Sequence, residues 1–254
     1  MLTGPLVSCS QSPPPPPAQR LRVEVLAILP HDRIMYTEGL EIHDGLLYEG
    51  SGLDGQSRLR ATAFGDTAAS DAPQREVSLP TPLFGEGITV AGTRLWQLTW
   101  RNGIAIERDP ATLAQRRQVR FQGEGWGLCH DGRRLVMSDG TDRLTFRDPA
   151  TFAPVGEVRV RLGDEPVRKI NELECAGGVV WANVYQTYRI LRIDPVTGTV
   201  TGVANASGLP GPPLPSAPGD VLNGIAAIPG TDEFLITGKH WPSLFRVRFV
   251  AGPQ

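Results

Sequence analysis

Five residues at one recurring position of this 254-residue chain could form a chemically active site. Each comes just before a short apolar run, in a frame that reads x-Gly-(Leu/Ile) or close to it. The residues are Glu38, Glu86, Trp126, Asn171 and Asn223. The fourth copy fits the frame less closely because Glu172 replaces the glycine. A position that varies among Glu, Trp and Asn inside a fixed frame is expected of a site whose residues have different tasks.

A second set of candidates follows about fourteen residues after the first. It consists of Ser51 or Gly52, Trp100, Asp139 or Gly140, Tyr185 and Lys239. Together the sets hold two carboxylates, two asparagines, one lysine and three large aromatic residues. Apolar walls with a few placed polar groups are typical of a pocket for a small ligand. Taken singly, each residue has an ordinary structural explanation, in the core, in a turn or on the surface. Their coincidence at equivalent positions favours a site.

Each pair of candidates is positioned by a predicted β-hairpin. The five hairpins read TEGLEIHDGLLYEGSG, GEGITVAGTRLWQLTW, GWGLCHDGRRLVMSDG, INELECAGGVVWANVY and LNGIAAIPGTDEFLITGK, with turns at Gly45, Gly92, Gly132, Gly177 and Gly230. Two apolar strands around a glycine turn are the usual signal of a hairpin. Because paired antiparallel strands are neighbours, the second strand ends beside the start of the first. We therefore expect both sets of candidates to open on one face.

The repeats predict the architecture of the whole chain. Successive turns are 47, 40, 45 and 53 residues apart, and Asp-Pro turns at positions 109, 148 and 194 mark a third strand in three copies. Four strands in about 40–50 residues correspond to one propeller blade. We predict an all-β fold, a single five-bladed β-propeller with four-stranded antiparallel blades over residues 21–254, in which residues 21–36 close the ring. A β-sandwich or two small barrels would not produce repeats of this length.

Composition and the N-terminus limit the partners and the location. The net charge is -2 and no basic run occurs, so we expect no nucleic-acid partner. No apolar stretch approaches the ~18 residues of a membrane span. Leu6-Val7-Ser8-Cys9 resembles a bacterial lipobox and precedes a proline run. We expect residues 1–20 to be a signal remnant and linker outside the fold. Either Cys9 carries a lipid anchor on a secreted or periplasmic protein, or the four-residue match is chance.

The three cysteines do not form a disulfide framework. Cys129 and Cys175 could pair only if their Cα atoms lie within ~7 Å, and we expect buried free thiols. The four histidines lack ligand spacing, so we predict no catalytic metal, while a structural calcium stays open. A monomer is expected because a propeller closes its own sheets.

Seven motifs in order resemble the glutaminyl-peptide cyclotransferases of the plant and bacterial type, the papaya-latex kind of glutaminyl cyclase. They are FGEGIT, LWQLTW, GEGWGL, INELE, ILRIDPVTG, VLNGIA and TGKHWP. The resemblance covers about residues 30 to 248 and implies a five-bladed propeller. It also implies an enzyme that converts the N-terminal glutamine of a peptide or protein into pyroglutamate and releases ammonia.

The resemblance also implies roles for individual residues. Glu86 occupies the position of the catalytic acid/base, with Asn171 and Lys239 as catalytic partners. The implied substrate-binding residues are Glu38, Tyr36, Phe84, Trp100, Trp126, Tyr185 and Asn223. The family often reads F-T-Q-G-L where this chain has Tyr36-Thr37-Glu38-Gly39-Leu40, so the binding of the substrate amine is expected to differ here. Burial among aromatic residues would raise the pKa of Glu86 toward the working pH.

Two other functions fit the same residues. A calcium-dependent propeller lactonase or similar hydrolase would use Glu38, Glu86, Asn171 and Asn223 as oxygen ligands. Lys239 at the same opening argues against this, because one cation repels another. The other alternative is a non-catalytic propeller that binds peptides.

Overall fold

The computed structural model describes residues 16–65, 73–210 and 219–253. The predictions for Cys9 and for most of the proline run lie outside the described residues. Within these ranges the chain is built of β-strands, without a helix. None of its described segments could therefore traverse a bilayer as a long apolar helix.

Three sheets each contain four antiparallel strands in chain order. The first consists of β2 (Thr37–His43), β3 (Leu46–Ser51), β4 (Arg58–Ala63) and β5 (Arg75–Ser78). The second consists of β6 (Gly85–Ala91), β7 (Arg94–Thr99), β8 (Ile104–Arg108) and β9 (Gln115–Arg120). The third consists of β10 (Leu128–His130), β11 (Leu135–Ser138), β12 (Arg143–Arg147) and β13 (Pro154–Arg159). Each opens with one of the hairpins predicted from the sequence.

The other strands form one eight-stranded sheet and a two-stranded hairpin. The large sheet runs in the order β16 (Ile170–Ala176), β17 (Val179–Val184), β18 (Arg189–Ile193), β19 (Val200–Asn205), β1 (Gln19–Pro30), β22 (Ser243–Ala251), β21 (Glu233–Gly238), β20 (Leu222–Ala227). The hairpin is β14 (Arg161–Leu162) with β15 (Glu165–Pro166). β1 pairs parallel to β19 and antiparallel to β22, so the N-terminal strand joins two parts of the sheet.

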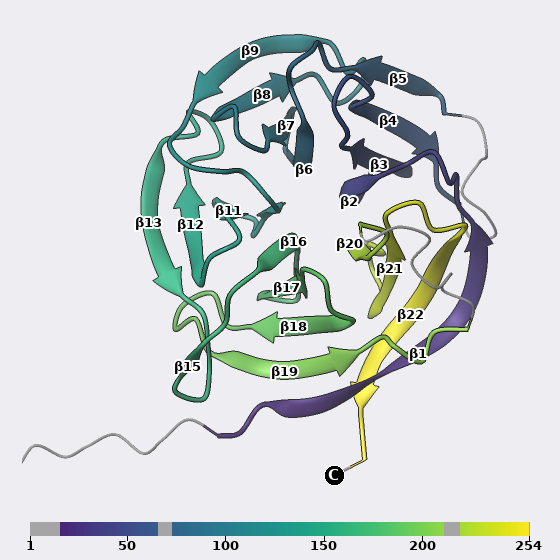
Figure 1. Ribbon diagram of the computed structural model, residues 1–254, viewed down its shortest axis with the longest axis vertical. Coiled ribbons are helices and arrows are strands. Elements are labelled where there is room, and N and C mark those ends of the chain that lie inside the picture. The colour runs from purple at the N-terminus through teal and green to yellow at the C-terminus, as the bar shows by residue number, and fades with distance from the viewer. Residues whose placement is uncertain (1–15, 66–72, 211–218, 254) are drawn as a thin grey trace, which may run out of the picture.

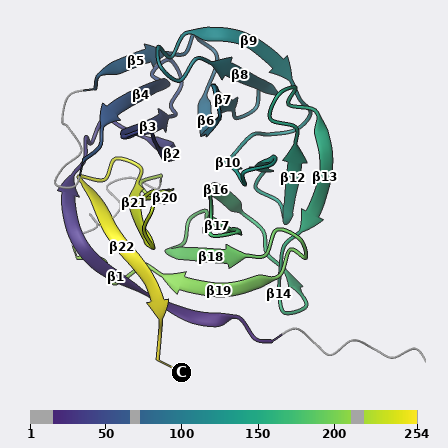
Figure 2. The same ribbon diagram turned by 180° about the vertical axis from the view of Figure 1, so that it is seen from behind.

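The sheets are arranged around a common centre like the blades of a propeller (Figure 1). The first strand of each hairpin lies inside, and β5, β9, β13, β19 and β1 lie at the rim (Figures 1 and 2). The inner strands contact one another in a closed order, β2 to β6, β6 to β10, β10 to β16, β16 to β20 and β20 to β2. The all-β, propeller-like architecture predicted from the repeats is therefore confirmed.

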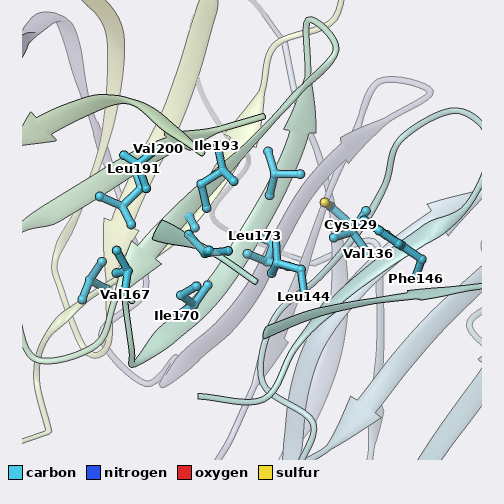
Figure 3. Packing of buried hydrophobic residues seen from close by; sticks show 14 residues of the cluster. Cys129, Val136, Leu144, Phe146, Val167, Ile170, Leu173, Leu191, Ile193 and Val200 are labelled. Carbon is cyan, nitrogen blue, oxygen red and sulfur yellow. The ribbon is translucent and has the colours of Figure 1, made fainter. Parts of the chain in front are cut away.

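The apolar core fills the spaces between neighbouring sheets. One cluster joins the third sheet to β16 and its neighbours, with Phe146 on one side and Leu173 on the other (Figure 3). At its edge Cys129 of β10 and Cys175 of β16 form a disulfide with a Cα–Cα distance of 5.4 Å. The prediction of free thiols was wrong. β10 contacts β16 in the inner ring, and this contact brings the two cysteines within bonding range.

Candidate active site

Irregularities at the start of the inner strands position the first set of candidate residues. The pairing register of β2, β6, β16 and β20 shifts at Glu38, Glu86, Asn171 and Asn223 respectively. A bulge of this kind re-aims a side chain relative to the regular pleat. The glycine of the repeat frame has a steric cause, because a Cβ at Gly87 would lie 2.5 Å from the carbonyl oxygen of Trp126. The frame therefore marks the places where inner strands approach most closely.

Glu172 explains why the fourth copy departs from this frame. Its buried carboxylate accepts hydrogen bonds from the backbone N–H groups of Leu40 (3.3 Å) and Ile225 (2.8 Å), on β2 and β20. Burial first, and then the charge of Glu174, raise the pKa of Glu172 well above its ordinary value. Glu172 ties inner strands together and does not line the cavity of the candidate site.

The second set of candidates lies directly after the second strand of each hairpin. In four copies, the backbone N–H of the second-set residue donates to a carbonyl oxygen two positions before the first-set residue. These bonds are Gly52 to Tyr36 (2.9 Å), Trp100 to Phe84 (3.1 Å), Tyr185 to Lys169 (2.9 Å) and Lys239 to Val221 (2.9 Å). The two sets meet on one face, as the hairpin geometry predicts.

These residues enclose a cavity of ≈ 180 Å³. Nine of the ten residues to which the family resemblance gave roles line it: Tyr36, Glu38, Phe84, Glu86, Trp100, Trp126, Asn171, Tyr185 and Lys239. Asn223 does not line the cavity. It is fully buried behind Glu38, where its Nδ2 donates to the Thr37 carbonyl (2.9 Å) and to Glu38 Oε2 (3.1 Å).

Five aromatic side chains form the wall of the cavity, and we call them the aromatic collar: Tyr36, Phe84, Trp100, Trp126 and Tyr185. The ring centroids of the first three lie 6.4 Å and 5.4 Å apart in sequence order, and those of the last two lie 5.6 Å apart. The ammonium of Lys239 is 4.5 Å from the ring centroid of Tyr36 and 5.4 Å from that of Tyr185. The lysine therefore bridges the two ends of the collar through cation–π contacts.

Two glycines of the second set allow aromatic rings of the collar to pack directly against the backbone. A Cβ at Gly52 would lie 2.3 Å from the ring of Phe84, and one at Gly140 would lie 2.6 Å from the indole of Trp126. Gly140 also has a φ of 76°, which side-chain-bearing residues rarely adopt. Of the pairs Ser51 or Gly52 and Asp139 or Gly140, the glycines are thus the members that contact the collar.

Three ionisable residues, Glu38, Glu86 and Lys239, form the polar floor, and we call them the charged triad. Lys239 Nζ donates to Glu38 Oε1 at 2.6 Å, with side-chain exposures of 5% and 2%. The carboxyl groups of Glu38 and Glu86 also share a hydrogen bond. The buried Oε2 of Glu86 has no hydrogen-bond partner among the described residues. That oxygen therefore keeps an unused capacity to accept or donate a hydrogen bond.

The triad holds one proton more firmly on Glu86 than on Glu38. Burial first, and then the negative charge of Glu38, raise the pKa of Glu86 well above its ordinary value. Burial also raises the pKa of Glu38, but Lys239 and the hydrogen bond with Glu86 oppose that rise. For Lys239, burial favours the neutral amine, yet the charges of Glu38 and Glu86 outweigh it and raise its pKa. The arrangement favours a neutral Glu86 beside a Glu38–Lys239 ion pair.

Sequence reasoning missed one residue at this site, Glu124. It lies two residues before Trp126, in the Gly-Glu-Gly tripeptide that also surrounds Glu86, but at a different place in the repeat. Its Oε2 accepts hydrogen bonds from the indole N–H groups of both Trp100 (2.8 Å) and Trp126 (2.9 Å). The shared tripeptide was the available signal.

This set of side chains can carry out proton transfer on a small bound group. A neutral carboxyl with a raised pKa serves as a general acid and then as a base. A lysine and an asparagine in the same cavity can stabilise negative charge on oxygen. Among the described residues, no three His, Cys, Asp or Glu side chains are grouped as metal ligands.

Comparisons with known proteins show relatives of this chain by sequence and by structure. The sequence model of the family described as glutamine cyclotransferase matches residues 2–249. A glutaminyl-peptide cyclotransferase from Arabidopsis thaliana is 36% identical over 231 residues, which are 89% of this chain and 71% of that protein.

Solved structures extend the comparison. A glutaminyl cyclase from Myxococcus xanthus superimposes with a TM-score of 0.83 at 40% identity, covering 93% of this chain and all (100%) of that one. The β-propeller domain of Cps50 (Swd1) from Myceliophteria thermophila gives a TM-score of 0.51 at 9% identity, over 89% of this chain and 99% of that one. This second likeness concerns the fold alone.

Proposed function

The chain belongs to the glutamine cyclotransferase family, and from this premise we infer that its cavity converts the N-terminal glutamine of a peptide or protein into pyroglutamate and releases ammonia. The observation that carries the assignment to this cavity is the charged triad at its floor, in which Glu86 keeps an unpartnered oxygen and a raised pKa. The details below are our proposal for how these residues perform the reaction.

Binding folds the glutamine so that its two ends meet. The α-amine must reach the side-chain carboxamide carbon, and an extended glutamine cannot do this. A cavity of ≈ 180 Å³ walled by the aromatic collar has room for a single side chain of this size. Well-aligned intramolecular reactions reach effective molarities of roughly 10⁵ M or more, so orientation supplies much of the rate.

Ring closure begins with attack by the neutral α-amine. Its nitrogen forms a bond to the carboxamide carbon, and the electron pair of the C=O double bond moves onto oxygen. The reaction needs the amine without its extra proton, and an α-amino group has a pKa of about 7.7–8.0. Lys239 and Asn171, which both line the cavity, are placed to donate to the resulting oxyanion. Asn223 has a different task, because both of its observed donor contacts hold the backbone and carboxylate beside it.

Glu86 then moves two protons in turn. Its neutral carboxyl gives a proton to the leaving nitrogen, the carbon–nitrogen bond breaks, ammonia departs and the carbonyl re-forms. The new carboxylate takes the surplus proton from the ring nitrogen, which restores the starting state. The raised pKa of Glu86 sets this order of acid first and base second.

The test is ammonia release from a glutamine-initiated dipeptide by the wild type and by Glu86→Gln, with EDTA present. We expect kcat to fall about 10²–10⁴-fold in the variant, which has the same shape but cannot exchange the proton. Glu157→Gln, an exposed carboxylate on β13, is the matched control and should keep wild-type activity.

Each other outcome would reject a specific part of the proposal. No turnover in a folded wild type would leave a peptide-binding propeller, and turnover lost only with EDTA would indicate a metal-dependent enzyme. We propose a metal-independent reaction, because a cation bound at the floor would lie beside the ammonium of Lys239.

We further infer that the eight-stranded sheet is two blades, β16–β19 and β20–β22 with β1, which makes five blades in total. The support is that each half repeats the hairpin and outer strands of the four-stranded sheets, with β1 as the outer strand of the last. A crystal structure with β1 apart from β22 would contradict this count.

A further inference from the structure

The aromatic collar has two places where one ring does not contact the next. Lys239 bridges the first, between Tyr185 and Tyr36, and the second lies between Trp100 and Trp126. Ring contacts run from Tyr36 through Phe84 to Trp100, and from Trp126 to Tyr185. Between the two tryptophans lies the carboxylate of Glu124. A single oxygen, Oε2, accepts the indole N–H of Trp100 at 2.8 Å and that of Trp126 at 2.9 Å. Glu124 is thus the link that fixes the two indoles relative to each other.

Glu124 occupies the repeat position that holds Tyr36 and Phe84 in the first two copies. Glu124 lies two residues before Trp126, as Tyr36 lies two before Glu38 and Phe84 two before Glu86. In the first two repeats this position supplies an aromatic member of the collar. In the third it supplies the acceptor that holds the two neighbouring members.

Further contacts surround Glu124, whose side chain is 40% exposed. The next residue, Gly125, donates its backbone N–H to the Trp100 carbonyl at 2.9 Å, and a Cβ there would lie 2.9 Å from the Thr99 oxygen. The second carboxylate oxygen, Oε1, pairs with Arg101 Nε at 3.4 Å. The guanidinium of Arg101 also stacks over the Trp100 ring, 3.7 Å from its centroid. Both oxygens therefore have partners, and the carboxylate cannot turn without losing one of them.

We propose that Glu124 is a positioning residue for cyclisation, which acts by locking Trp100 and Trp126 at the spacing that keeps the bound glutamine folded. The inference rests on the proposed function, because the folded substrate is the one that the cyclase reaction requires. Glu124 acts through the indoles and exchanges no proton with the substrate. Its charge also contributes, as the last of several causes, to the raised pKa of Glu86. Without it, the walls separate and the substrate samples extended conformations that cannot close.

Substitutions at position 124 can show whether activity depends on the hydrogen bonds to both indoles or only on the negative charge of Glu124. A glutamine places a neutral amide oxygen where Oε2 stands and can accept both indole protons. An aspartate keeps the charge but is one methylene shorter and cannot reach both indoles. The lock therefore predicts activity in the order Glu, Gln, then Asp and Ala, whereas a charge effect predicts Asp above Gln.

The experiment measures kcat and KM for a glutamine-initiated dipeptide in the wild type, Glu124→Gln, Glu124→Asp and Glu124→Ala. We expect Glu124→Gln within about threefold of the wild type, and kcat/KM about 10–100-fold lower in the other two, mainly through kcat. Glu157→Gln is the control. Wild-type kinetics in Glu124→Ala, or retention of activity by Asp and not by Gln, would overturn the proposal.

A second measurement keeps the lock testable without catalysis. In ¹⁵N-labelled protein, two indole N–H signals should lose protection from hydrogen exchange in Glu124→Ala and keep it in Glu124→Gln. If the wild type forms no pyroglutamate, the proposed function fails. The hydrogen-exchange result would still show whether Glu124 holds the two indoles. If all indole signals are unchanged in Glu124→Ala, the lock is wrong even in an active enzyme.

Discussion

Replacing Lys239 by methionine should reduce stability and activity by amounts that can be separated. The substitution leaves the carboxylate of Glu38, with a side-chain exposure of 2%, without the partner that now lies 2.6 Å away. Removing one member of a buried ion pair typically costs about 3–5 kcal/mol of unfolding free energy. The double variant Glu38→Gln/Lys239→Met removes both charges and should return to within about 1–2 kcal/mol of the wild type.

The loss in Lys239→Met should also depend on pH in a defined direction. Burial raises the pKa of Glu38, and the charge of Lys239 opposes that rise, so loss of the lysine raises the folded-state pKa further. Well below the ordinary value of 4.5, Glu38 is protonated in both the folded and the unfolded chain, and the penalty is small. As the pH increases, the unfolded chain ionises first, and the penalty grows until the pH exceeds the folded-state pKa.

Chemical denaturation followed by tryptophan fluorescence at pH 4 and pH 8 measures the stability, and ammonia release measures the activity. The double variant should regain stability yet remain about 10²-fold or more below wild-type kcat, because it lacks the lysine that we propose as donor to the oxyanion. The exposed Lys169→Met, which loses one hydrogen bond to Gln186, is the control and should change stability by less than about 0.5 kcal/mol. Equal losses in the single and double variants, or a loss independent of pH, would refute the reasoning.

Two further predictions concern other parts of the fold. Both ring nitrogens of buried His31 face acceptors, the Trp241 carbonyl at 2.7 Å and Glu49 at 2.9 Å. Burial lowers the pKa of His31, but the charge of Glu49 and these hydrogen bonds raise it by more; the pKa of Glu49 is lowered despite its burial. The pair should therefore stabilise the fold most between these two pKa values. The stability lost in His31→Gln should shrink as the pH rises through the folded-state pKa of His31. A loss of unfolding free energy that does not change with pH would contradict this. The disulfide closes a loop of 46 residues, so Cys129→Ala/Cys175→Ala should lower the unfolding free energy by about 2–4 kcal/mol, and a reductant that destabilises the wild type should leave this variant unchanged.

Local features of the sequence were sufficient to predict most of the candidate site. The repeat frame is local because a bulge begins four of the five hairpins and a closely packed glycine begins four of them. Aligning the frames therefore brought Glu86, Trp100 and Lys239 to one cavity before any distance was known. The same alignment could not show that Asn223 lies behind Glu38, because depth depends on how far neighbouring inner strands tilt and approach.

Alignment of the repeats could not predict contacts between neighbouring sheets. The pairing of Cys129 with Cys175 depends on the distance between β10 and β16, which neither hairpin determines alone. Glu124 was overlooked for a related reason. Its partners are two indoles from different repeats, and its own frame matches that of Glu86 only in the flanking glycines.

The position of β1 has a consequence for the order of events during synthesis. This strand precedes every other described strand, yet it pairs with β22, roughly 210 residues later in the chain. At the usual 5–20 residues per second, it waits about 10–40 s before that partner is translated. Throughout this time β1 presents unpaired backbone groups that can associate with other nascent chains. A chaperone that covers extended segments near the ribosome would therefore protect this protein most at β1.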